Sequence, residues 1–241
     1  MGKIKRTSEL LWLIGIIFVA LGVAICSKAN LGVSMIAAPA FVVSERLISV
    51  SPFFTVGVTE YLLQGVLLII LCILVRKFDW RYLLAFAVAV IYGYTLDLIL
   101  LILGSVEFNA IWLRWLMLLI GDVITGFGVA CFFRTYMPLQ VYELFVSEIT
   151  KRFRLNINRV KTTFDMVLLG VSVLLALVLF LDIGGFDFTS LYYSSYHSIG
   201  LGTLVTTLLN GQIIKYSGVL IDRIFEPTAL IPSMEKILKL D

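Results

Sequence analysis

Residues 10–28 read LLWLIGIIFVALGVAICSK, a run with no charge before its final lysine. A helix rises about 1.5 Å per residue, so a run of this length covers roughly 30 Å, the thickness of the hydrocarbon core of a bilayer. The run cannot be an open strand, because each unpaired backbone N–H or C=O group in lipid costs several kcal/mol. The stretch therefore predicts a transmembrane helix.

The rest of the chain repeats this pattern. With 60% hydrophobic and 15% charged residues, the 241-residue chain carries more apolar surface than one water-soluble core can bury. Six apolar windows long enough to span run approximately over 10–28, 56–75, 82–103, 112–133, 162–181 and 199–221. We expect an all-α integral membrane protein, a single transmembrane domain (1–241) of six transmembrane helices.

The first window also resembles a secretory signal, because Met1–Arg6 is basic and Ser27-Lys28-Ala29 imitates a cleavage site. The apolar stretch is longer than the roughly 7–15 residues of a signal core, and a lysine interrupts the site. We expect this segment to be kept as the first helix.

The loop charges predict the orientation. Of the 19 Lys and Arg residues, Lys28, Arg46 and Arg114 fall on one side and Lys215 falls within a span, which leaves 15 on the side of the N-terminus. Short cytoplasmic loops are rich in Lys and Arg. We expect both termini in the cytoplasm, with residues 224–241 as a cytoplasmic C-terminal tail.

The two halves of the chain share an order of parts. Leu21-Gly22-Val23-Ala24 ends the first span and Phe127-Gly128-Val129-Ala130 ends the fourth, each followed within two residues by a cysteine. A polar break and a short semi-polar segment follow in each half, over 31–47 and 138–153. These segments are too short and polar to span, and they fit either interfacial amphipathic helices or re-entrant helices.

Each short segment precedes two further spans, the second of which holds an aligned glycine, Gly93 or Gly211. We therefore expect two repeats, over approximately 9–104 and 111–223. Because three spans per repeat is an odd number, the repeats must be inverted relative to each other, as in many secondary transporters.

Several glycine-rich stretches together resemble the YczE/YyaS/YitT family of bacterial multi-spanning membrane proteins; they are Leu21–Ala24, Ala29–Ser34, Gly93–Asp97, Gly200–Thr203 and Asn210–Gly211. The similarity covers roughly residues 10–222. It implies a six-helix architecture in a bacterial plasma membrane, with transport as the expected activity.

Ionisable residues within spans normally face the bundle interior, where they mark a pathway or a structural pair. Aligning Gly93 with Gly211 places Asp97 opposite Lys215 in the two repeats. The two charges fit a structural ion pair, a solute or proton site, or side chains that extend to the interface. Asp97, Asp165 and Glu60 are the candidates for proton coupling.

The polar breaks supply further candidates for substrate binding, because a broken helix presents free backbone groups to a solute. The candidates there are Asn30, Ser34, Arg134 and Gln140, and those beside the aligned glycines are Tyr92 and Asn210. As alternatives, Arg134 fits an interface anchor, and Asn30 and Ser34 fit helix caps.

The sequence contains no recognisable motif for catalysis or for metal binding. The three cysteines lie in apolar windows without metal-ligand spacing, and the one histidine, His197, has no nucleophile at useful spacing. Walker, Rossmann, HExxH and GxSxG patterns are absent from the sequence. We expect no enzyme activity, no metal or other cofactor, and no nucleic-acid partner, since the basic residues lie in separate loops.

We therefore expect a small-solute transporter or exporter that works by alternating access between inverted repeats. The bilayer and an unknown small solute are the expected partners. The alternative is a non-transporting scaffold or accessory subunit that binds another protein through the basic segment 134–161. A homo-oligomer or a membrane-protein partner is compatible with either function.

Overall fold

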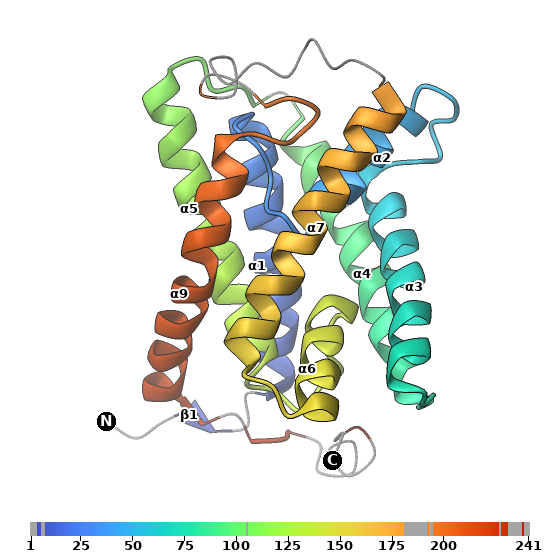
Figure 1. Cartoon of the computed structure of the whole chain (residues 1–241). Coiled ribbons are helices and arrows are strands. Elements are labelled where there is room, and N and C mark those ends of the chain that lie inside the picture. The colour runs from blue at the N-terminus through green and yellow to red at the C-terminus, as the bar shows by residue number, and fades with distance from the viewer. Residues whose placement is uncertain are drawn as a thin grey trace.

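The computed structural model describes residues 4–5, 8–104, 106–180, 192, 195–226, 228–230 and 238. Six long helices form the bundle in Figure 1: α1 (Ser8–Ala29), α3 (Val56–Val75), α4 (Arg81–Ile102), α5 (Ile111–Phe132), α7 (Ile157–Phe180) and α9 (Leu201–Ile224). Each is long and apolar enough to cross a membrane. The six predicted spans are confirmed, and the fold is that of a multi-pass membrane protein.

The helix boundaries agree with the predicted windows except at α7, which begins at Ile157 and not at 162. Its first turns carry Arg159 and Lys161. Charged turns can extend a spanning helix beyond the hydrocarbon, so hydropathy alone does not detect them.

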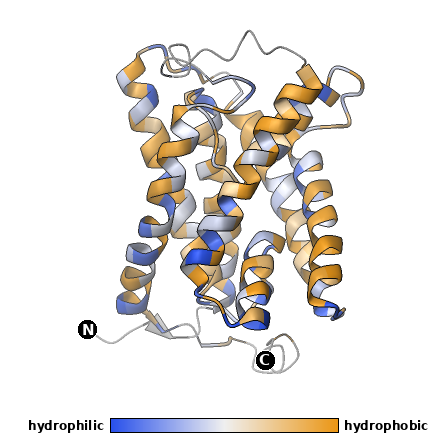
Figure 2. Ribbon diagram, viewed as in Figure 1, coloured by the Kyte–Doolittle hydropathy of each residue, from blue (hydrophilic) through white to orange (hydrophobic). Residues whose placement is uncertain are grey.

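The bundle surface is largely apolar. Figure 2 shows hydrophobic residues along the outward faces of α3, α5 and α7, and hydrophilic residues gathered at the lower ends of α6, α7 and α9. α1 and α5 are the most buried spans, whereas α7 and α9 are the most exposed. A belt of exposed apolar side chains is the surface that contact with a lipid bilayer requires.

Residues that flank the bundle meet at one end of it. Strands β1 (Ile4–Lys5) and β2 (Phe225–Glu226) pair in parallel, with Ile4 opposite Phe225. After the two strands, the Ser8 N–H donates a hydrogen bond to the carbonyl of Thr228 at 3.3 Å. The start of α1 and the end of α9 therefore lie on the same side, as an even number of spans requires.

Two short helices lie inside the bundle, α2 (Ala38–Leu47) in its upper half and α6 (Val141–Phe153) in its lower half (Figure 1). Near the end of α2, the Ser44 hydroxyl donates to the carbonyl of Phe54, in the loop before α3, at 3.0 Å. Near the end of α6, Glu148 accepts from the Tyr82 hydroxyl at the base of α4 at 2.8 Å. The C-terminal ends of the two helices thus point to opposite ends of the bundle, and their N-terminal ends point to its middle.

The most extensive helix packing joins α1 to α5. A Cβ atom built at Gly22 would lie 2.4 Å from the carbonyl oxygen of Gly121, and one built at Gly128 would lie 2.9 Å from that of Gly15. Seven residues are close to two helical turns, so the glycines of each helix share one face. The pairing of an early glycine with a late one shows that the helices are antiparallel.

A larger residue at this crossing is expected to force the helices apart. Gly22→Val should lower the free energy of unfolding by about 3 kcal/mol through overpacking, measured by reversible unfolding in mixed micelles. Gly170→Val on α7 is the matched control, since Gly170 is exposed and a Cβ there meets nothing within 4 Å. Equal stability of the two variants would contradict the close α1–α5 crossing.

Candidate functional site

A small enclosed cavity lies where the N-terminal ends of the two short helices meet. Its volume is about 20 Å³, which is room for about one water molecule. The lining comes from five of the spans and both short segments, and comprises Val19, Val23, Ser34, Ile36, Ala37, Glu60, Tyr92, Thr125, Val129, Gln140, Tyr142, Glu143 and Asn210.

Two carboxylates line this cavity, Glu60 on α3 and Glu143 on α6. Their exposed fractions are 1% and 4%. The Tyr142 hydroxyl donates a hydrogen bond to Glu60. One oxygen of each carboxylate, Oε2, has no hydrogen-bond partner among the described residues.

Unpartnered amide groups surround the carboxylates. Within the described part of the chain, Gln140 Nε2 and Asn210 Oδ1 have no hydrogen-bond partner, whereas the Gln64 amide contacts Glu60. These three side chains are at most 5% exposed. Each buried polar group left unpaired costs about 1–3 kcal/mol, so the cluster is poorly suited to a purely structural core and well suited to a polar ligand.

Local structure explains how the chain gathers these groups. Glu60 and Gln64 are four residues apart on α3, so they share one face. Gln140 is the N-cap residue of α6 and Glu143 lies in the first turn of that helix. The helix dipole places partial positive charge at this end, which stabilises a nearby carboxylate.

The cavity lining includes acidic residues and no Lys or Arg. The nearest basic partner is on α7, where Lys161 attracts Glu143 and also pairs with Asp165, Nζ to Oδ1, at 3.4 Å. Glu60 has no basic residue beside it in the cavity lining, and an ionised carboxylate enclosed without a counter-charge is costly in a low dielectric. The site can therefore be neutralised by a proton or by a bound cationic solute.

The structure brings half of the ten predicted site residues to this one cavity: Ser34, Tyr92, Gln140, Asn210 and Glu60. They come from segments far apart in the sequence. The prediction identified the polar breaks and the residues beside the aligned glycines, and these are the parts that meet in the middle of the bundle.

An ion pair between Asp97 and Lys215, one of the three alternatives for these charges, is not among the ion pairs of the described residues. Asp97 Oδ2 accepts from the Thr55 hydroxyl at 2.6 Å, and Asp97 Oδ1 accepts from the Gly57 N–H at 2.8 Å. Lys215 is exposed on α9. The charges are not brought together because Asp97 is held at the N-terminus of α3, where it satisfies a free backbone donor.

The remaining predicted site residues lie outside the cavity lining. Asn30 Oδ1 accepts from the Ser195 hydroxyl at 2.7 Å. Arg134 holds Asp222 with two hydrogen bonds of 2.7 and 2.9 Å. Asp165 pairs with Lys161 on its own helix. None of these three side chains lines the central cavity.

Sequence reasoning missed Gln64, Thr125, Tyr142 and Glu143 as site residues. The pair Glu60 and Gln64, four residues apart in an otherwise apolar window, was a signal that could have revealed Gln64. Glu143 gave no such signal, because a glutamate in a short, semi-polar segment is ordinary when that segment lies at the interface.

Stretches that support the family resemblance also meet in space. The Val33 N–H donates to the Ser198 carbonyl at 3.0 Å, and the Gly202 N–H donates to the Leu31 carbonyl at 2.9 Å. Gly32 has φ +110°, a conformation that glycine adopts readily. The break after α1 is thus fixed against the start of α9.

Comparison with known proteins gives a match over residues 4–218 to DUF6198, described as a family of unknown function. The chain belongs to this family. It is also 26% identical over 216 residues to the uncharacterized protein YyaS of Bacillus subtilis (strain 168), covering 88% of this chain and 92% of that protein. The resemblance to YyaS is thereby supported, whereas the match does not extend to the names YczE and YitT. No solved structure matches the chain.

The separate environments of Asp97 and Lys215 predict independent effects on stability. Asp97→Asn should lower the free energy of unfolding by about 1–3 kcal/mol, because a charged acceptor of two hydrogen bonds is lost. Lys215→Met should change it by less than about 0.5 kcal/mol.

A double-mutant cycle in mixed micelles checks this independence. The double variant should match the sum of the single changes to within about 0.5 kcal/mol. A coupling energy above about 1 kcal/mol would show that the two charges interact and would contradict their independence.

Proposed function

We propose that this protein is a small-solute transporter whose central site is the cavity between α2 and α6. The observation that supports this most directly is the pair of buried carboxylates, Glu60 and Glu143, surrounded by unpartnered amide groups. Ionisable residues deep in a membrane bundle typically mark a solute or proton pathway. We assign no catalytic residue.

The packing of the helices supports an inverted repeat of approximately 9–104 and 111–223. If α1, α2, α3 and α4 correspond to α5, α6, α7 and α9, most contacts have a counterpart. α1 packs on α4 as α5 does on α9, and α2 packs on α3 as α6 does on α7. Across the halves, α2 packs on α7 as α6 does on α3.

In this reading α2 and α6 are re-entrant helices, because each ends on the side of the bundle where its segment began. Their N-terminal ends then meet near the midplane of the bilayer, which is where secondary transporters place their binding sites. A polar backbone at that depth is tolerated because it is enclosed by protein.

The cavity is closed toward both ends by contacts between the halves. On the upper side, Asn30 bonds to Ser195. On the lower side, the Trp12 Nε1–H donates to the Pro138 carbonyl at 3.0 Å, and Tyr136 bonds to Glu9. If the contacts at one end break while those at the other end remain, the cavity opens to one side of the membrane at a time, which is alternating access.

One seam between helices is looser than its counterpart. A Cβ at Gly57 would lie 2.0 Å from the Gly93 carbonyl oxygen, so α3 and α4 are in close contact. Gly211 on α9 aligns with Gly93 on α4, and a Cβ built at Gly211 would meet nothing within 4 Å. We infer that the second half yields most easily along its α7–α9 seam, whereas α3 and α4 of the first half move together.

The lower end of the bundle is proposed to be cytoplasmic, in a bacterial plasma membrane. The turns and helix ends there carry Arg76, Lys77, Arg152, Arg154 and Arg223. A surplus of Lys and Arg in short loops favours the cytoplasmic side.

Cysteine accessibility tests alternating access without knowledge of the solute. Ser34→Cys and Gln140→Cys, each with the three native cysteines replaced by alanine, should react with an impermeant thiol reagent from both sides of oriented vesicles. Leu71→Cys is the buried control, since Leu71 is fully buried within the bundle, and it should react from neither side. Lack of reaction at positions 34 and 140 from either side would favour the non-transporting scaffold.

Removal of a central carboxylate should strongly reduce transport of cationic solutes. In proteoliposomes, uptake of a panel of labelled amines (methylammonium, ethanolamine, agmatine) should fall at least roughly 10-fold in Glu60→Gln or Glu143→Gln, because about 1.4 kcal/mol of binding energy is a factor of ten. The control is Glu107→Gln, since Glu107 is exposed. Undiminished uptake in both central variants would contradict the role of the carboxylates.

A further inference from the structure

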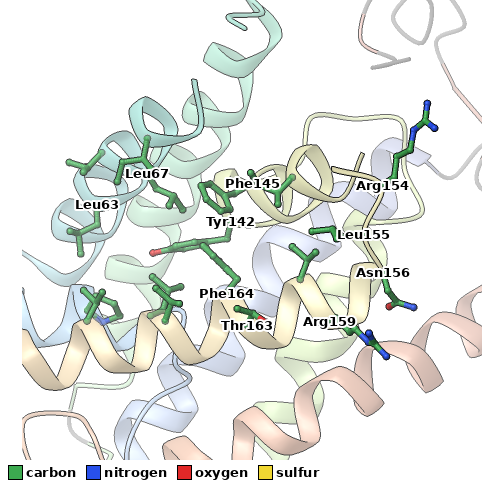
Figure 3. A pocket seen from close by; sticks show the side chains of 18 residues that line it. Leu63, Leu67, Tyr142, Phe145, Arg154, Leu155, Asn156, Arg159, Thr163 and Phe164 are labelled. Atoms are coloured by element: carbon green, nitrogen blue, oxygen red, sulfur yellow. The ribbon is translucent and has the colours of Figure 1, made fainter. Parts of the chain in front are cut away.

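A second and much larger hollow opens on the side of the bundle, between α3, α6 and α7. This groove has a volume of about 700 Å³, within the roughly 300–1,000 Å³ of typical ligand sites. Figure 3 shows Leu63 and Leu67 on α3 across the groove from Tyr142, Phe145 and Phe164.

The groove differs in chemistry along its length. Its inner part is apolar and aromatic, with the rings of Phe145 and Phe164 stacked at 4.9 Å. At the turn between α6 and α7, Arg154 and Arg159 lie at its edge (Figure 3). Both arginines are exposed, and neither has an ion-pair partner among the described residues.

The rim of the groove faces lipid. Val66, Ile70 and Val167 line it and are 54%, 43% and 57% exposed. These positions lie on spanning helices, where an exposed apolar side chain contacts acyl chains. The arginines stand at the lower end of the bundle, where the headgroups of one leaflet begin.

We propose that this groove is a specific site for an anionic phospholipid. Arg154 and Arg159 extend in different directions from this edge of the groove (Figure 3). A planar guanidinium matches phosphate with paired hydrogen bonds, so one arginine binds the phosphate of the headgroup while the other adds positive charge. An acyl chain lies between α3 and α7 against Phe145 and Phe164. Basic pockets between transmembrane helices bind anionic headgroups in this way.

The proposed site is connected to the central cavity through Tyr142. This side chain lines both the groove and the cavity, and its hydroxyl donates to Glu60. The lipid therefore contacts the residue that orients a central carboxylate. The binding of the lipid does not depend on the proposed transport function.

Native mass spectrometry of the purified protein tests the proposal. Wild-type protein mixed with equal amounts of phosphatidylglycerol and phosphatidylcholine should retain about one phosphatidylglycerol. R154Q/R159Q should weaken the retention of phosphatidylglycerol roughly 20- to 30-fold, because each basic residue near the membrane surface contributes about 1 kcal/mol. R76Q/K77Q removes the same charge from the same end, outside the groove, and should retain phosphatidylglycerol as the wild type does.

A groove-filling variant tests the acyl-chain contact separately. L67W should reduce retention of phosphatidylglycerol, whereas L62W should not, since Leu62 lies on α3 outside the groove. Equal loss in R154Q/R159Q and R76Q/K77Q would overturn the specific site. So would displacement of the lipid by millimolar inorganic phosphate, or retention unchanged in both R154Q/R159Q and L67W.

Discussion

The antiparallel contact between α1 and α5 is the constraint on which the rest of the structure depends. In lipid there is no hydrophobic force between helices, so close approach through small residues must supply the packing energy. Gly15 and Gly22 on one helix and Gly121 and Gly128 on the other permit this approach. With these two spans joined in the centre, the short helices and outer spans can pack around them.

The central polar cluster destabilises the fold, whereas the packing of α1 on α5 stabilises it. Burying Glu60 and Glu143 among unpartnered amides opposes folding, because each group gives up its hydration. The hydrogen bond from Tyr142 and the N-terminal end of α6 offset part of this cost. The polar groups of this cluster can form hydrogen bonds with a ligand that enters the cavity in place of water.

The sequence predicted much of the fold, and half of the ten predicted site residues line the central cavity. Hydropathy located all six spans, since the thickness of a bilayer sets the length of each helix. The polar breaks and aligned glycines indicated Ser34, Tyr92, Gln140 and Asn210, which meet at the cavity. An ion pair between Asp97 and Lys215, one of the alternatives that the sequence left open, does not form, because Asp97 accepts hydrogen bonds at the start of α3. Glu143 was missed because its burial depends on where α6 packs.

The sequence by itself determined that the chain is a bundle of six apolar helices with two polar interruptions, because length and hydrophobicity act locally and need no knowledge of neighbours. Only the tertiary structure decided that both interruptions turn their helix N-termini toward the centre of the bundle. It also decided which carboxylates are enclosed there and which basic residues border the lateral groove. These features depend on contacts between segments far apart in the sequence, such as the hydrogen bond from Tyr142 to Glu60, and no local pattern of residues encodes such contacts.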